Sequence, residues 1–372
     1  MLSKVSRSLV ACNIYVSAGG HPNHRDMLLG LLGETQELCR LANNKKGGNS
    51  NAQSMALDRR VVVVHAFRDG PYDRSSFHLA GAPDLVADVG SSLAVRAIQA
   101  LMSFESANNL HAVGKEPIER RHPTVGLVDH VSVLPLEEDN LSSSSSSSSC
   151  SGTNQNDIAS VAGSVARSIG ETLQSAEADV LYYGHAHPSG KELAAVRRDS
   201  TRFFEDNQTE NSTNRSNHAR IPKSSGQATV GAPHRFVENV NIRLRPNVSR
   251  KVARTLTESV RERSGRGLPF VEALTLAYGR DQYEVACNLL DPSVTSARDI
   301  ENRMRDWQEE QLQQVHRQQQ DGISSALVET AYRVGTTTDM CLQALREVST
   351  EKGEMAHNQQ VFKRFQENFL SG

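Results

Sequence analysis

The sequence is poor in several residue types that define specialised proteins. Its five cysteines are widely spaced, odd in number and without a Cys-x-x-Cys pair, which argues against a disulfide framework and favours a reducing compartment. Aromatic residues make up only 5% of the chain, and the aromatic-glycine-aromatic strand typical of RNA-recognition sheets is missing. The formal net charge of −2 gives no overall basic field for nucleic acid.

Long apolar runs are also missing. None approaches the roughly 20 residues that span a bilayer. The first eight residues carry two cations but no apolar segment of signal-peptide length. From these absences we expect a cytoplasmic protein without a membrane or nucleic-acid partner.

Polar, low-complexity segments interrupt the chain. Eight consecutive serines occupy positions 142–149, and such a composition cannot bury enough apolar surface to order itself. We therefore assign residues 43–58, 137–156 and 205–226 to polar insertions and residues 1–8 to an N-terminal tail.

Between the insertions, apolar residues alternate in some stretches and recur at helical spacing in others. The first half predicts, in order, a strand (9–16), a helix (24–41), two strands (60–67 and 75–80), a helix (84–103) and a strand (125–136). The second half repeats the order strand, helix, strand, strand, helix between residues 235 and 320.

This order is the split β-α-β pattern of ferredoxin-like sandwiches. We expect an α/β (α+β) fold of two ferredoxin-like βαββαβ subdomains packed side by side. Their predicted bounds are 9–235 and 236–350, with a helical tail over 351–372. A cleft between two such subdomains would be a favoured ligand site.

His122 lies in a segment that suits proton transfer. It precedes Pro123, which disfavours the helical conformation for the residue before it, and the strand predicted over residues 125–136 begins two residues later. An imidazole on a stiff loop that enters a sheet can take and give a proton near neutral pH. A histidine before a proline is also a common surface feature, so neighbouring motifs have to support this interpretation.

Seven short motifs follow one another along the chain. They are Leu9-Val10-Ala11-Cys12 with Ser17, Gly70-Pro71, His122-Pro123-Thr124-Val125-Gly126-Leu127-Val128-Asp129, Leu181-Tyr182-Tyr183-Gly184, Ala228-Thr229-Val230-Gly231-Ala232, Phe236-Val237-Glu238-Asn239-Val240-Asn241-Ile242, and Val285-Ala286-Cys287-Asn288-Leu289-Leu290-Asp291. In this order the chain resembles the glutamate formiminotransferase family, the N-terminal module of formiminotransferase-cyclodeaminase. It looks most like the shorter plant and algal-type members.

The resemblance implies an enzyme that transfers one-carbon groups in histidine catabolism. Members of this family move a formimino group from N-formimino-L-glutamate to N5 of tetrahydrofolate, which lies in a groove between two similar α/β subdomains. The catalytic histidine of the family corresponds to His122, whose imidazole would act as general acid and base. A homodimer is also implied.

The resemblance further assigns binding residues. The folate contacts fall on Ser225, Gly226, Gly231, Gly267, Val271 and Asn241. For the donor substrate we expect Arg121, Asp129 and Arg198, because guanidinium groups suit carboxylates and Asp129 ends the His122 motif. Further candidate anion-binding residues are Arg197, Arg243 and Arg245.

Other functions fit parts of the sequence. The folate-contacting stretch that is basic in the family has no cation over residues 267–273 here. This change leaves open a non-catalytic folate or anionic small-molecule binding protein of the same fold. His122, His130, His185 and His187 would suit a metal centre, but the sequence has no His-Glu-x-x-His run, no cysteine pair and no carboxylate at ligand spacing, so a metal is disfavoured. Cys12 and Cys287 lie in apolar strands, where thiols are usually inert.

Overall fold

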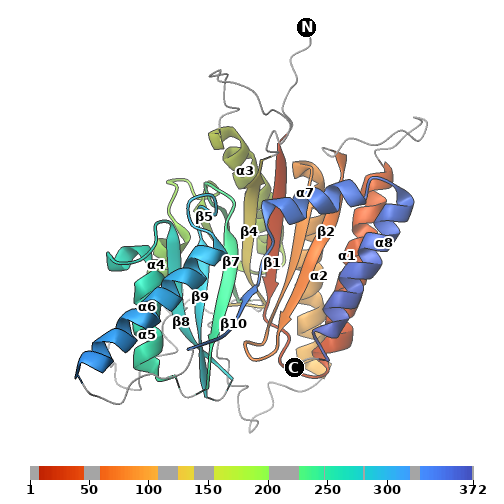
Figure 1. The fold of residues 1–372 in the computed structure, drawn as a ribbon. Helices are drawn as coiled ribbons and strands as arrows, with labels where there is room; N and C mark the ends of the chain where they lie inside the picture. The colour runs from red at the N-terminus through yellow and green to blue at the C-terminus, as the bar shows by residue number, and fades with distance from the viewer. Residues whose placement is uncertain are drawn as a thin grey trace, which may run out of the picture. The chain divides into compact units, whose positions relative to one another are not determined.

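The computed structural model (Figure 1) divides into two compact units. The first unit comprises Met1–His234 together with Thr338–Gly372, and the second comprises Arg235–Thr337. The structure describes residues 8–45, 59–107, 125–137, 155–200, 226–246, 248–279, 281–318 and 327–370. Most of each predicted polar insertion lies outside these ranges.

The first unit begins with a βαββαβ arrangement. Its elements are β1 (Leu9–Val16), α1 (His24–Lys45), β2 (Val61–Asp69), β3 (Arg74–Gly81), α2 (Pro83–Ala107) and β4 (Val128–Leu136). The strands lie in the order β2-β3-β1-β4, and each neighbouring pair is antiparallel. This is the split β-α-β topology, so the ferredoxin-like fold predicted from the sequence is confirmed here.

Two further strands extend this sheet. The additional elements are α3 (Gln155–Ser175), β5 (Asp179–Gly184), α4 (Leu193–Ser200) and β6 (Gln227–Ala232). β6 pairs in parallel with β4 and with β5, which gives the order β2-β3-β1-β4-β6-β5. Parallel neighbours need a crossover connection, and α3 supplies one while packing on β4, β5 and β6.

One face of this sheet is covered by helices because its strands alternate apolar and polar residues. On β1, Val10, Cys12, Ile14 and Val16 point into a core shared with α1 and α2. By length and composition α2 could cross a membrane, but 50% of its most apolar stretch is buried. Burial of this kind is common for the core helix of a globular unit.

The C-terminal helices return to the first unit. α7 (Thr338–Glu347) packs on β2 and β3, and α8 (Glu351–Glu367) packs on β2 and beside α1 (Figure 1). Val361 and Phe365 of α8 are buried in the core of the first unit. The structure thus corrects two predicted bounds, the second subdomain at 236–350 and the separate tail at 351–372. The physical reason is that the apolar face of α8 completes the helical layer.

The second unit has the same topology in a smaller form. Its elements are β7 (Glu238–Leu244), α5 (Arg250–Val260), the 3₁₀ turn η3 (Glu262–Ser264), β8 (Val271–Tyr278), β9 (Gln282–Leu289), α6 (Ala297–Gln318) and β10 (Val328–Arg333). The sheet order is β10-β7-β9-β8 with antiparallel neighbours. The second ferredoxin-like subdomain is therefore also confirmed, and β10 closes it.

Candidate functional site

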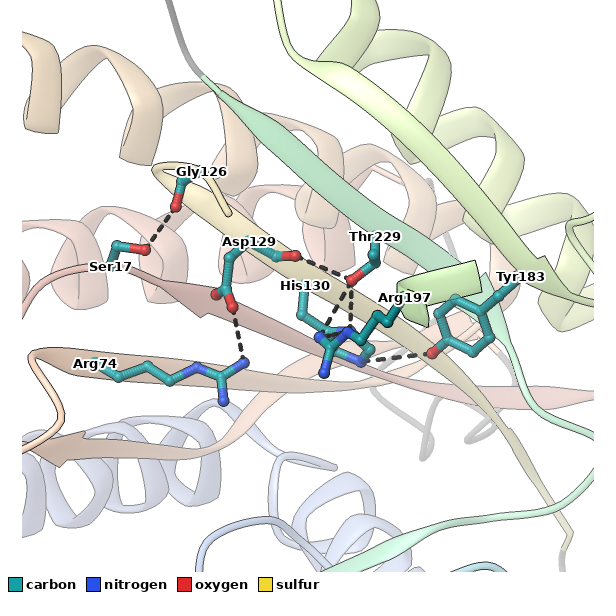
Figure 2. Close-up of polar contacts among 8 residues, drawn as sticks. All are labelled: Ser17, Arg74, Gly126, Asp129, His130, Tyr183, Arg197 and Thr229. Carbon is teal, nitrogen blue, oxygen red and sulfur yellow. Dashed lines mark hydrogen bonds and ion pairs between the residues drawn. The ribbon is translucent and has the colours of Figure 1, made fainter. Parts of the chain in front are cut away.

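The face of the first sheet that lies opposite α1, α2 and α3 is polar. Asn13 and Tyr15 of β1 alternate with the core-facing residues, and their cross-strand partners include His78, Ser76 and His130. The side chains of these five residues are all buried. Because they lie side by side on one face of the sheet, we call them and their hydrogen-bond partners the polar network. Figure 2 shows the part of this network around the start of β4.

The described end of the His122 motif is anchored to this sheet. Ser17, which follows β1, donates from Oγ to the carbonyl of Gly126 at 2.6 Å and from its backbone N–H to Leu127 at 2.9 Å. On the other side, Gly226 forms a bridge with Gly126 and has a φ of 72°. A Cβ at Gly226 would lie 2.7 Å from Cα of Gly126, so this close approach requires glycine.

Asp129, the last residue of the motif, lies at a β-bulge. The pairing of β1 with β4 shifts between Tyr15 and Val16, which leaves Asp129 as the extra residue. Its side chain is 0% exposed, and Oδ2 accepts from Nη2 of Arg74 at 3.2 Å. Oδ1 is buried and has no hydrogen-bond partner among the described residues. Such an oxygen is costly in a low-dielectric environment, which marks Asp129 as a candidate functional residue.

His130 is the next residue on β4, and both of its ring nitrogens lie close to polar groups. Nδ1 lies 3.1 Å from Nη2 of Arg197 and 3.0 Å from Oγ1 of Thr229. A guanidinium can only donate, so we assign Nδ1 as the acceptor and the proton to Nε2. Nε2 lies 3.5 Å from the hydroxyl of Tyr183, which donates to Ser132 at 2.9 Å. The network therefore fixes one neutral tautomer of His130.

Arg197 reaches this network from α4 (Figure 2). Its Nη2 also donates to Oγ1 of Thr229 at 3.3 Å, and Thr229 donates to the backbone carbonyl of Asp129 at 3.0 Å. Burial lowers the pKa of Arg197 to about 10, an effect that Asp129 opposes and Arg74 strengthens. The guanidinium keeps its charge at neutral pH, so the network contains a desolvated cation.

Aromatic rings lie beside the two arginines. The guanidinium carbon of Arg74 is 4.2 Å from the centre of the Tyr15 ring, a cation–π contact. His130 stacks on Tyr183 with 5.6 Å between ring centres and meets Tyr15 edge-on at 5.5 Å. Burial raises the pKa of both tyrosines, so both phenols stay neutral.

The polar network continues across β3 and β2. Nδ1 of His78 is 2.7 Å from Oδ1 of Asn13, and its Nε2 is 2.9 Å from Oγ of Ser76. The ring of His65 lies 5.5 Å from that of His78. Burial lowers the pKa of His78 well below its usual value and that of His65 to about 4. Both imidazoles are therefore neutral at neutral pH.

The site residues expected in the first unit fall in different places. His122, Arg121 and Ser225 lie outside the described residues. Asp129 is part of the polar network. Gly226 holds the backbone of the His122 motif close to β6.

Arg198 and Gly231 are the remaining expected residues of this unit. Arg198 is exposed, whereas the adjacent Arg197 makes the contacts with His130. Gly231 lies on β6, where a Cβ would meet the backbone oxygen of Tyr183 at 2.4 Å. Glycine at this position therefore allows β5 and β6 to pack closely.

The other expected folate contacts lie in the second unit. A Cβ at Gly267 would come within 2.1 Å of the backbone oxygen of Arg261. Val271 is 1% exposed and packs in the hydrophobic core. Asn241 is buried, and its Nδ2 donates to Oε2 of Glu284 at 3.1 Å. All three residues thus have structural partners within their own unit.

Sequence reasoning passed over several members of the network. It treated His130 only as a metal candidate, and it did not name Arg74. Tyr183 and Thr229 appeared only as members of family motifs, without a role. One usable signal was the alternation along β4, which sets His130 and Ser132 against the core residues of that strand. No comparable signal marks Arg74, because its role depends on the bulge at Asp129.

Within the described ranges, the structure gives little support for a metal centre or for a reactive thiol. No group of three or more His, Cys, Asp or Glu side chains there could hold a metal ion. His185 and His234 contact each other directly, with 2.7 Å between their ring nitrogens. Burial raises the pKa of Cys12 and of Cys287 to about 12, so both thiols stay protonated.

Comparison with known proteins adds an independent line of evidence. A family model described as the formiminotransferase domain, N-terminal subdomain, matches residues 42–233. A protein of Arabidopsis thaliana named formiminotransferase cyclodeaminase-like protein is 25% identical over 294 residues, which cover 74% of this chain and 87% of that protein.

Among solved structures, the periplasmic protease PqqL from Escherichia coli aligns with a TM-score of 0.18 and 12% identity. The alignment covers 99% of this chain and 41% of PqqL, so the chain spans less than half of that structure's length. A TM-score this low carries no argument about fold or function.

Proposed function

The chain belongs to the formiminotransferase family, and on that premise we propose that it moves a formimino group from N-formimino-L-glutamate to N5 of tetrahydrofolate. The resemblance seen in the sequence is confirmed at the level of the family. Membership supports folate-related formimino transfer in general. The observation that carries the proposal is the family match over residues 42–233, because this interval contains the complete His122 motif.

The reaction needs a group that moves a proton twice. A C–N bond forms between N5 and the amidine carbon, and the C–N bond to the nitrogen of glutamate then breaks. N5 loses one proton and the departing nitrogen gains one, so the products are 5-formiminotetrahydrofolate and glutamate. We assign both transfers to His122, since an imidazole that titrates near neutrality can accept and then donate. Such catalysis contributes roughly 10²–10⁴-fold.

The described residues after His122 support this assignment. The backbone that leaves the motif is held by Ser17 on one side and by Gly226 on the other. Catalytic groups depend on supporting residues that fix their geometry. Both substrates also end in glutamate carboxylates, and the guanidinium groups of Arg74 and Arg197 suit such groups.

The test is a transfer assay with the full chain, tetrahydrofolate and N-formimino-L-glutamate. We expect 5-formiminotetrahydrofolate as product, and we expect His122→Ala to lower kcat by about 10²–10⁴-fold. Binding of tetrahydrofolate, measured by calorimetry, should change little in this variant. The control is His234→Ala, which removes a histidine whose side chain is 60% exposed.

Three outcomes would contradict the proposal or a part of it. Absence of product at high enzyme concentration would exclude the reaction. Binding of tetrahydrofolate without transfer in the unmodified chain would instead support a non-catalytic folate-binding protein. A His122→Ala variant with unchanged kcat would leave the reaction in place and remove His122 from it.

A further inference from the structure

We propose that Arg68 is a positioning residue for formimino transfer and that the turn after α8, residues 368–370, holds it in place. Arg68 joins this turn to the segment after β1, residues 17–20, which contacts the backbone of the His122 motif. The effect on catalysis rests on the proposed function. The link itself consists of contacts within the first unit, so it can be tested without any substrate.

Arg68 lies near the end of β2 and bridges two backbone segments. Its Nε donates to the carbonyl oxygen of Gly19 at 2.7 Å, and its Nη1 donates to the carbonyl oxygen of Asn368 at 3.0 Å. The guanidinium carbon also lies 4.9 Å from the centre of the Phe369 ring, a cation–π contact. Because the donors of a guanidinium lie in one rigid plane, these contacts fix the position of Gly19 relative to the turn after α8.

The segment after β1 in turn contacts the described end of the His122 motif. Ser17 donates from Oγ to the carbonyl of Gly126 and from its backbone N–H to that of Leu127 (Figure 2). Only one residue separates Ser17 from Gly19, so a displaced Gly19 carbonyl would also disturb Ser17. A glycine restricts the backbone little, and the conformation of the segment therefore depends on contacts from outside it.

Other contacts hold the same segment against the sheet. Ser75 donates from Oγ to the carbonyl of Ala18 at 2.7 Å, and Oδ1 of Asp73 accepts from the backbone N–H of Gly20 at 2.7 Å. Both side chains come from β3 and the turn before it. Arg68 adds a connection of a different kind, because its partner in the turn after α8 lies 300 residues further along the chain.

The turn after α8 is itself fixed by the core of the first unit. Phe369 packs against that core and meets the buried Phe365 edge-on, with 5.4 Å between ring centres. The backbone N–H of Asn368 donates to the carbonyl of Arg364. The side of Arg68 that faces α8 is therefore rigid. Supporting residues of this kind keep a reacting group in its productive geometry.

The first test is the transfer assay with Arg68→Met, which removes every donor and keeps an unbranched side chain. Misplacement of a reacting group by about 1 Å can cost about 10²-fold. We expect kcat to fall by about tenfold or more. KM for both substrates should stay within about twofold, because no interaction with substrate is removed. Arg96→Met is the control, since Arg96 pairs with Glu34 on the surface of the helical layer.

Arg68→Gln separates the two halves of the bridge. Its amide nitrogen takes the place of Nε and can still donate to Gly19, but the side chain is too short to reach Asn368. We expect kcat between those of Arg68→Met and the unmodified chain. An unmodified kcat in Arg68→Gln would show that the turn after α8 is not needed, and this result would overturn the proposal.

A double-mutant cycle tests whether the turn acts through Arg68. Phe369→Ala should lower kcat by about threefold or more, and it should add no further loss in the Arg68→Met background, because contacting residues are not additive. Phe362→Ala is the matched control on α8, since this ring is also half-buried against the same core. It should lose stability but less than about twofold in kcat. Losses that multiply in the double variant would overturn the link.

Hydrogen exchange measures the link directly. The backbone N–H groups of residues 17–20 all donate hydrogen bonds, so their exchange reports local opening. We expect exchange to speed up by about tenfold in Arg68→Met and in Phe369→Ala, but not in Phe362→Ala. Unchanged exchange in Arg68→Met would overturn the link even if the variant were less stable.

The two proposals fail separately. Faster exchange at residues 17–20 in Arg68→Met, with no transfer by the unmodified chain, would reject the function and leave the link in place. Transfer with an unchanged kcat in Arg68→Met would do the reverse, since it would remove the positioning role of Arg68 and leave the function.

Discussion

The positions of two side chains in the polar network depend on the exact residue register of β4 and α4. Strict alternation along β4 would place Asp129 and His130 on opposite faces of the sheet, but the bulge brings both into the network. On α4, Arg197 contacts His130 while the adjacent Arg198 is exposed. A shift of one residue in either element would therefore change which side chain enters the network.

Gly226 allows a test of how closely the His122 motif is held against β6. Its φ of 72° is left-handed, and a Cβ would lie 2.7 Å from Cα of Gly126. Gly190 has a similar φ of 67°, but a Cβ there would have no neighbour within 4 Å. We expect Gly226→Ala to lower the free energy of unfolding by about 2–4 kcal/mol, against about 1–2 kcal/mol for Gly190→Ala.

Urea denaturation followed by circular dichroism measures both variants. Gly190→Ala is the matched control, because it carries only the cost of a left-handed alanine. Equal losses in the two variants would contradict a close contact between Gly226 and the motif. The transfer assay adds a second readout, since displacement of the motif should lower kcat in Gly226→Ala alone.

At this scale the sequence indicated only part of the candidate site. Asp129 could be selected because it ends a recognisable motif. Arg197 could not be separated from Arg198, because a short polar helix gives no periodic signal strong enough to decide which side chain is buried. Arg74 and Asp129 are 55 residues apart, and their pairing follows from strand register rather than from local sequence.

At the level of elements, α8 is joined to the first unit by a histidine as well as by its apolar face. Nδ1 of His357 is 2.8 Å from Oε2 of Glu347, and its Nε2 is 2.9 Å from the carbonyl oxygen of Val63. The two ring nitrogens of His357 thus lie within hydrogen-bond distance of Glu347 and of the backbone of β2. The hydrogen bond from His357 lowers the pKa of Glu347.

His357→Ala should therefore loosen α8. The variant removes two hydrogen bonds, one of them to the carbonyl oxygen of Val63. We therefore expect the free energy of unfolding to fall by about 2–4 kcal/mol. Met355→Ala is the control on the same helix, because Met355 is 58% exposed and its loss should change stability by about 0.5 kcal/mol or less. Hydrogen exchange of α8 measures the loosening directly, and equal protection in both variants would contradict it.

Most long elements could be predicted from apolar periodicity, whereas three of the short ones, α4, β6 and β10, could not. α4, β6 and β10 have eight residues or fewer, which leaves little room for a period to repeat. β6 is also rich in small residues, because Gly231 must pack against Tyr183. The return of α7 and α8 to the first unit depends on contacts with β2 and α1, which no local pattern contains.

At the scale of the whole molecule, buried neutral histidines link stability to pH. Burial lowers the pKa of His65 to about 4 and that of His78 well below its usual range, while an unfolded chain keeps a value near about 6.5. Between these values the unfolded chain binds protons that the folded chain excludes, so unfolding becomes more favourable as the pH falls. The stability associated with these histidines is complete above about pH 6.5 and is lost progressively below it.

We accordingly expect the midpoint of thermal unfolding to fall by several degrees between about pH 7.5 and about pH 5. His78→Gln replaces the imidazole with a side chain that does not titrate. It should therefore lower the unfolding midpoint at the higher pH and reduce the difference in midpoint between the two pH values. His234→Gln is the control, because its side chain is 60% exposed and should leave the drop unchanged. Scanning calorimetry at constant ionic strength compares the three proteins. A drop of the same size in His78→Gln and in the unmodified chain would assign the acid sensitivity to carboxylates instead of to the histidines of the polar network.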